Sequence, residues 1–144
     1  MKKIVFLAAA VLLSCGARVS AVTAADASLI ADVLCAECAG EPFAARVTIA
    51  GELLDMAAEE DGCVADAVRA LGAAGVFSLG GVASVDRGSA EYRVSADAVD
   101  AAIAGCRPLG EVSRISRAEK ERPSLDFADG EEQPGVRLGN FVFE

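Results

Sequence analysis

One short break between two apolar helical segments constrains the fold of this chain most strongly. From Ala27 to about Ala39 the apolar residues recur at helical spacing, and Gly40 ends that segment. Pro42 suits the first turn of a second helix, which runs to about Ala58 and is apolar on most of its sides. The sequence therefore predicts two consecutive helices, of which the second is central and largely buried.

Glu37 lies inside the apolar stripe of the first of these helices. At about 100° per residue, it falls between Ile30 and Val33 on the helical wheel. Burial disfavours the charged form of a carboxyl group, so we expect a raised pKa for Glu37 and a proton on it near neutral pH. Such a group can be the general acid that cleaves a glycosidic bond. The alternative is that Glu37 sits at a frayed helix end and reaches water.

The rest of the chain predicts two more helices and some β-structure. A turn at Asp61 and Gly62 precedes a third helix, and a glycine-rich loop or very short hairpin follows over residues 75–88. Ser95 is expected to cap a fourth helix, which Gly105 and Pro108 end.

Two segments near the C-terminus contrast with each other. Residues 119–135 are highly charged and predict a mobile loop, whereas residues 136–143 alternate in the pattern of a strand. The predicted fold class is α+β, mostly helical, with a small β-sheet.

The N-terminus has the charged start and short apolar core of a secretory signal. Residues 19–21, V-S-A, match an ordinary cleavage site, so we assign residues 1–21 to the signal and residues 27–144 to one domain. The alternative, which we favour less, is processing at a lipobox ending at Cys15, which would leave the protein lipid-anchored. Either way we expect the protein to leave the cytoplasm, with no membrane span in the mature chain.

Composition excludes several classes of function. The formal net charge is −9 and no basic cluster follows the signal, which argues against nucleic acid as a partner. The chain has no histidine, so Ser-His and Cys-His nucleophiles and His-based metal sites are excluded. No phosphate-binding or dinucleotide-binding motif occurs. We expect neither a cofactor nor a metal, and carboxylates remain as the candidate chemistry.

Four cysteines follow the signal: Cys35, Cys38, Cys63 and Cys106. In an exported chain an even number permits two disulfides. Cys35 and Cys38 lie one helical turn apart, so cross-links from their helix to Cys63 and Cys106 are favoured over a bond between them. Plain buried thiols are the other structural interpretation. A redox pair or a four-cysteine zinc site is disfavoured, because the close pair lies near a helix C-terminus and no second close pair exists.

Five motifs follow one another in a set order along almost the whole chain after residue 26. Residues 37–45 read E-C-A-G-E-P-F-A-A, close to a signature E-A-x-G-E-P-Y/F-E-G. The other four, including G-V-F-S near a G-Q-F-S turn and a closing L-G-N-F-V-F near I-G-N-H-x-F, lie at residues 46–56, 75–78, 96–105 and 137–143. In this order they resemble the cell wall hydrolases of the SleB (spore cortex-lytic) type.

The resemblance implies a lysozyme-like and lytic-transglycosylase-like fold, acting on the glycan strands of peptidoglycan as a monomer. Glu37 would be the catalytic acid and base, since lytic transglycosylases use a single glutamate. Glu41 is the candidate second carboxylate, although a cap for the helix at Pro42 is an equal interpretation. Residues that the resemblance places in the substrate groove are Phe77, Ser78, Asn140 and Phe141, with Phe141 equally suited to the core.

Three departures from the family pattern bear on activity. Phe141 stands where the family has histidine, and Val76 stands where it has glutamine. An aromatic-rich A-L-Y-F strand is replaced after Gly110 by E-V-S-R-I-S, which removes rings that could stack on sugars. A catalytically inactive, wall-binding or structural protein on the same fold is therefore the alternative.

Overall fold

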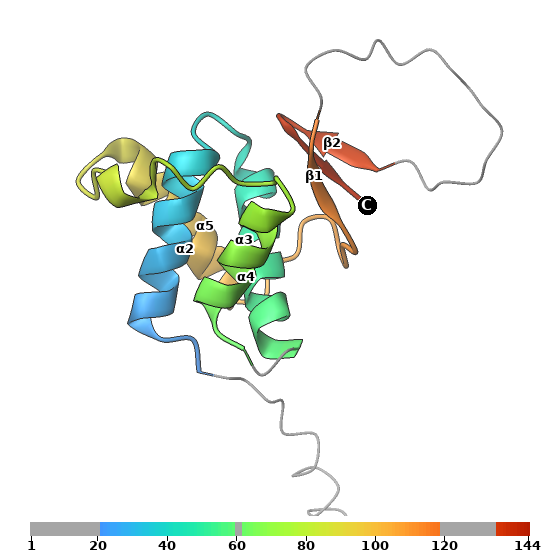
Figure 1. Ribbon diagram of the computed structural model, residues 1–144, viewed down its shortest axis with the longest axis horizontal. Coiled ribbons are helices and arrows are strands. Elements are labelled where there is room, and N and C mark those ends of the chain that lie inside the picture. The colour runs from blue at the N-terminus through green and yellow to red at the C-terminus, as the bar shows by residue number, and fades with distance from the viewer. Residues whose placement is uncertain (1–20, 60–61, 119–134) are drawn as a thin grey trace, which may run out of the picture.

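The computed structural model describes residues 21–59, 62–118 and 135–144. Four α-helices form the larger part of the described chain, and a small antiparallel sheet lies beside them (Figure 1). The predicted α+β class is confirmed. Three predicted features lie wholly or mostly outside the described residues. They are the signal, which contains Cys15, the position of Asp61 in the predicted turn, and the charged loop over residues 119–135.

The first described helix, α2 (Ala24–Glu37), begins earlier than predicted because Thr23 caps it. The Thr23 hydroxyl accepts a hydrogen bond from the Asp26 N–H, and the Asp26 carboxylate accepts one from the Thr23 N–H. The helix ends at Glu37, and Gly40 follows with a φ of +77°. This places Glu37 at the last position of a well-capped helix.

The helices α3 (Phe43–Glu59) and α4 (Val64–Ala73) lie close to their predicted positions. As predicted, α3 is central: it packs against α2, α4 and α5. Its residues 45–51 are all buried. The apolar character of this segment is explained by its packing on three helices.

The fourth predicted helix, α5 (Ala90–Ile103), starts at a different serine from the one expected. Ser89 is the cap and accepts a hydrogen bond from the Tyr92 N–H. The prediction that Ser95 begins this helix is wrong, because Ser95 is fully buried inside it and its hydroxyl accepts from the Arg46 guanidinium at 3.2 Å.

The predicted strand over residues 136–143 is a hairpin. Strands β2 (Val136–Leu138) and β3 (Phe141–Phe143) pair around a turn at Gly139 and Asn140, and β1 (Ile115–Arg117) pairs with the other edge of β3. Gly139 has a φ of +60°, which a side chain would oppose. The alternation of residues over 136–143 continues through the turn, so the sequence pattern did not indicate that a turn divides the segment.

One hydrophobic core joins the helices to the sheet. Ile30, Val33 and Leu34 of α2 belong to the same buried cluster as Phe141 and Phe143 of β3. The sheet is thereby fixed against the helical body, which brings β1 near the end of α2. None of the described helices combines the length and the apolar character needed to cross a bilayer.

Candidate active site

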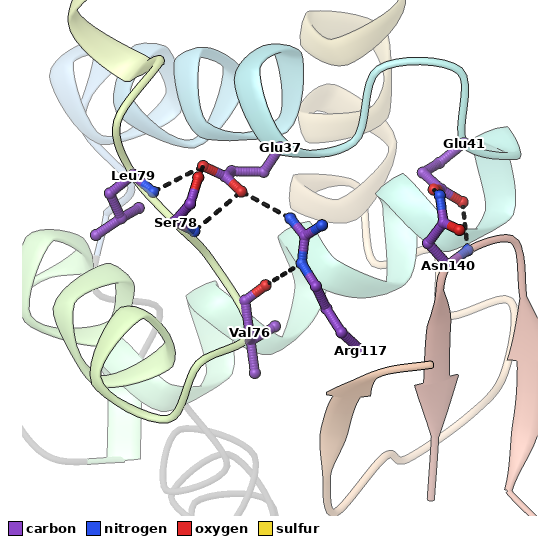
Figure 2. A network of polar contacts seen from close by, with 7 residues as sticks. All are labelled: Glu37, Glu41, Val76, Ser78, Leu79, Arg117 and Asn140. Carbon is purple, nitrogen blue, oxygen red and sulfur yellow. Dashed lines mark hydrogen bonds and ion pairs between the residues drawn. The ribbon is translucent and has the colours of Figure 1, made fainter. Parts of the chain in front are cut away.

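The Glu37 carboxylate lies at the meeting point of α2, the loop after α4, and β1 (Figure 2). Ser78 donates its N–H to Oε2 at 3.1 Å and its hydroxyl to Oε1 at 2.8 Å. The Leu79 N–H donates to Oε1 at 2.7 Å, and Arg117 Nη2 donates to Oε2 at 2.7 Å. Four donors therefore surround a side chain that is only 3% exposed.

Close packing shapes the loop that supplies three of these donors. Val76 and Phe77 are buried, and the Val76 N–H donates to the carbonyl of Leu71 at the end of α4. Leu79 has a φ of +59°, a conformation that costs a non-glycine residue on the order of 1 kcal/mol. A side chain on Gly72 would meet the Leu79 side chain at 2.8 Å. The loop thus holds a strained Leu79 whose N–H points at Glu37.

The environment of Glu37 reverses the expected direction of its pKa. Burial raises the pKa, as predicted, but the two hydrogen bonds from Ser78, the Leu79 N–H and the Arg117 charge together outweigh burial. The pKa of Glu37 therefore lies below its ordinary value. The prediction that Glu37 carries a proton near neutral pH is wrong for this state of the protein, and the carboxylate is ionised.

Arg117 is the site residue that the sequence did not reveal. Besides its bond to Glu37, its Nε donates to the Val76 carbonyl at 2.7 Å, and its guanidinium lies 5.3 Å from the centre of the Phe141 ring. Arg117 is 80 positions from Glu37, and no local pattern links the two. Leu79 was missed as well, because its backbone N–H, which any residue but proline carries, makes the contact.

Glu41 has a structural role at the other side of Gly40. Its carboxylate accepts hydrogen bonds from the Asn140 N–H at 3.0 Å and from the Asn140 side-chain amide (Figure 2). A Cβ on Gly139 would lie 1.6 Å from Glu41 Oε2, so only glycine fits there. Glu41 thus fastens the hairpin turn to the α2–α3 loop, and it binds neither Glu37 nor the donors of Glu37.

The four predicted groove residues divide by exposure. Phe77 and Phe141 are 4% and 0% exposed and belong to the core, so neither ring can stack on a sugar here. Of the two interpretations for Phe141, the core is confirmed. Ser78 and Asn140 are exposed residues, and their side chains bind Glu37 and Glu41.

All four described cysteines are free thiols. The predicted cross-links to Cys63 and Cys106 are absent from the structure, and both of these residues are exposed. Cys38 matches the alternative of a plain buried thiol: burial raises its pKa to about 12. A buried thiol with so high a pKa is a poor nucleophile, which further disfavours a redox pair with Cys35.

Three surface cavities in the described part of the chain have walls that do not include Glu37. One of about 540 Å³ has apolar walls from α2 and the loop around Val82, and includes the ion pair of Arg87 with Asp32 at 2.6 Å. Two others, of about 670 and 500 Å³, lie between α3 and the segment before β1. The cavity of about 540 Å³ nevertheless comes close to the site, because Leu79, whose N–H donates to the Glu37 carboxylate, lines it.

Comparison with known proteins finds no family model, no curated protein and no solved structure that matches this chain. The resemblance to SleB-type hydrolases therefore stays a prediction that depends on the motifs in this sequence and on their arrangement in space.

Proposed function

We propose that this chain is a secreted cell wall hydrolase of the lytic transglycosylase type, with a lysozyme-like fold, which cleaves the glycan strands of peptidoglycan. The observation that carries the proposal is the convergence of separate motifs. Glu37 from the first motif meets Ser78 from the G-V-F-S turn, and Glu41 from the first motif meets Asn140 from the closing motif. Both contacts join motifs that lie far apart in the sequence, as the resemblance to a single family requires.

The proposed chemistry needs one carboxyl group. In its acid form Glu37 gives its proton to the oxygen of the scissile glycosidic bond, and the leaving sugar departs. The resulting carboxylate takes the proton of the sugar's own 6-hydroxyl, whose oxygen closes a 1,6-anhydro ring. Glu37 ends the cycle protonated, and no water is consumed.

The lowered pKa of Glu37 sets the pH range for this chemistry. A general acid acts in its protonated form, and that form becomes abundant only as the pH falls toward the pKa of the group. Because the pKa of Glu37 lies below its ordinary value, the proposal requires cleavage to increase from neutral toward acid pH.

The test is digestion of purified peptidoglycan by the mature protein at several pH values, with mass spectrometry of the soluble products. Anhydro-muropeptides that disappear in Glu37→Gln support the proposal. Glu52→Gln is the matched control, because Glu52 is another partly buried glutamate and lines a cavity whose walls do not include Glu37. Products with ordinary reducing ends would contradict the transglycosylase type, and absence of products at every pH would contradict cleavage.

A second candidate is a catalytically silent protein that binds the wall. The specific observation in its favour is that Glu37 is ionised and saturated with hydrogen bonds. This candidate predicts that the protein sediments with insoluble peptidoglycan, that Glu37→Gln sediments equally well, and that neither releases muropeptides.

A further inference from the structure

We propose that Arg117 is a displaceable lock on Glu37: a glycan strand has to move the guanidinium aside before Glu37 can act as an acid. This inference rests on the proposed function and adds a positioning residue to it. The guanidinium of Arg117 is held beside the carboxylate by its bonds to Glu37 and the Val76 carbonyl (Figure 2). The Phe141 ring, 5.3 Å from the guanidinium, is its third contact.

Arg117 differs from the other donors in where it comes from. Ser78 and Leu79 are neighbours in one loop, whose backbone is fixed by the buried Val76 and Phe77. Arg117 instead reaches across from β1 on a long side chain that is 42% exposed. Its departure requires a change of side-chain rotamer and no movement of the backbone.

The energy of the contact also suits a lock that opens. An ion pair in which one partner is partly exposed is weakened, because water and salt screen it. A bound glycan can compensate for that loss with a few hydrogen bonds of its own. The interaction is thus strong enough to order the resting site and weak enough for a substrate to break.

The position of Arg117 also explains why the site is closed. The Glu37 side chain is 3% exposed, and it does not line any of the three cavities described above. Arg117 is the more exposed partner of the pair, so it lies on the solvent side of the carboxylate. Its removal both opens a path to Glu37 and withdraws the positive charge that favours the ionised form.

The charged groups near Glu37 leave Arg117 as the main electrostatic partner. Among the described residues, Arg117 alone forms an ion pair with Glu37. Directly after α2, Cys38 is a titratable neighbour of Glu37, and burial raises its own pKa far above neutrality. From α3 and the loop before it, Arg46 and Glu41 act on Cys38 with opposite signs. The loop after α4 contributes only uncharged donors.

The test compares Arg117→Met and Arg117→Lys with the wild-type protein. Met retains the length of the stem without charge, whereas Lys retains the charge but not the planar pair of donors. Arg114→Met is the control, because Arg114 precedes β1 and its partner is Glu144 at 3.6 Å. Two readouts are measured from pH 4 to 8: release of muropeptides, and the ¹³C chemical shift of the Glu37 carboxyl carbon.

The lock predicts that Arg117→Met cleaves roughly tenfold faster than wild type at neutral pH, since loss of a nearby opposite charge raises the pKa of a carboxyl group by about one or more. The ¹³C titration midpoint of Glu37 moves to higher pH in parallel. Arg117→Lys lies between wild type and Arg117→Met, and Arg114→Met behaves as wild type.

Different results would contradict the role of Arg117 and the proposed function. A Glu37 midpoint that does not move in Arg117→Met overturns the lock, whatever the cleavage rates. Slower cleavage by Arg117→Met at every pH also overturns it, since Arg117 would then assist the reaction. If the midpoint rises but no variant releases muropeptides at any pH, the proposed function fails and the lock on catalysis fails with it.

Discussion

Glu37 and Glu41 stand on either side of Gly40, both with nearly buried carboxylates, yet the protein uses them differently. Glu41 accepts the N–H and side-chain amide of a single residue, Asn140, and holds a hairpin turn. Glu37 accepts donors from two separate elements, and one of these donors is a half-exposed arginine. A carboxylate held by one rigid turn is a structural tie, whereas a carboxylate held in part by a movable side chain can change its state.

The largest expected effect is on stability, at Gly139 in the hairpin turn that Glu41 binds. In Gly139→Ala the new Cβ would lie 1.6 Å from the Glu41 carboxylate at a φ of +60°, so we expect a loss of about 3 kcal/mol in the free energy of unfolding. Gly75→Ala is the control, because Gly75 has a φ of +77° with nothing within 4 Å, and about 1 kcal/mol is expected there. Urea denaturation measures both.

A double variant isolates the part due to Glu41. In a Glu41→Ala background the collision with the carboxylate is gone, and Pro42 Cδ at 3.1 Å is the closest remaining atom. Gly139→Ala should then cost about 1–2 kcal/mol, mostly the backbone term. Equal costs for Gly139→Ala in both backgrounds would contradict the role of Glu41 as the tie.

The next effect concerns Glu37 and depends on pH. Because the pKa of Glu37 is lower in the folded than in the unfolded state, its ionised form stabilises the protein above the unfolded pKa. Glu37→Gln should therefore be less stable than wild type at pH 7, by about 1 kcal/mol once screening of Arg117 is allowed for. The difference should vanish as the pH falls through the folded pKa.

For Glu52→Gln we expect the opposite sign when the free energy of unfolding is compared with that of wild type at different pH values. Burial, with the nearby Asp55 charge, raises the pKa of Glu52, so its ionised form destabilises the fold. Glu52→Gln should gain stability relative to wild type as the pH rises from about 4 to 7. A Glu37→Gln difference that grows toward acid pH would contradict the lowered pKa.

The smallest effect is expected for Ser78→Ala. This change removes the hydroxyl donor at 2.8 Å but keeps the N–H donor, so we expect a loss of about 0.5 kcal/mol. The control is Ser84→Ala, whose exposed hydroxyl donates to the uncharged carbonyl of Gly81 and should cost close to nothing. Thermal unfolding at pH 7 separates the two, and equal melting temperatures would show that the Ser78 hydroxyl does not support Glu37.

Much of the helical part could be predicted from the sequence, because capping and apolar spacing are local. The helices α3 and α4 lie where glycine, proline and the apolar pattern place them. The start of α5 was mistaken because two serines could each cap it, and only tertiary packing shows that Ser95 is a buried partner of Arg46. The hairpin was missed because strand alternation runs unbroken through Gly139 and Asn140.

The candidate site could be predicted only in part. The position of Glu37 in an apolar stripe correctly indicated burial, since burial follows from helical geometry. The direction of its pKa depends instead on donors from a loop and from a strand, which are distant in sequence. Arg117 could not be found, because the strand that carries it meets α2 only through the folded core.

The measurement that tests this account most directly is a ¹³C titration of the Glu37 carboxyl group in the wild-type protein, with Glu37→Gln used to assign its signal. We expect a midpoint below the ordinary value of a glutamate, because the hydrogen bonds from Ser78, Leu79 and Arg117 outweigh burial. A midpoint above that value would contradict the ionised, locked site and would restore a glutamate that is protonated by burial alone.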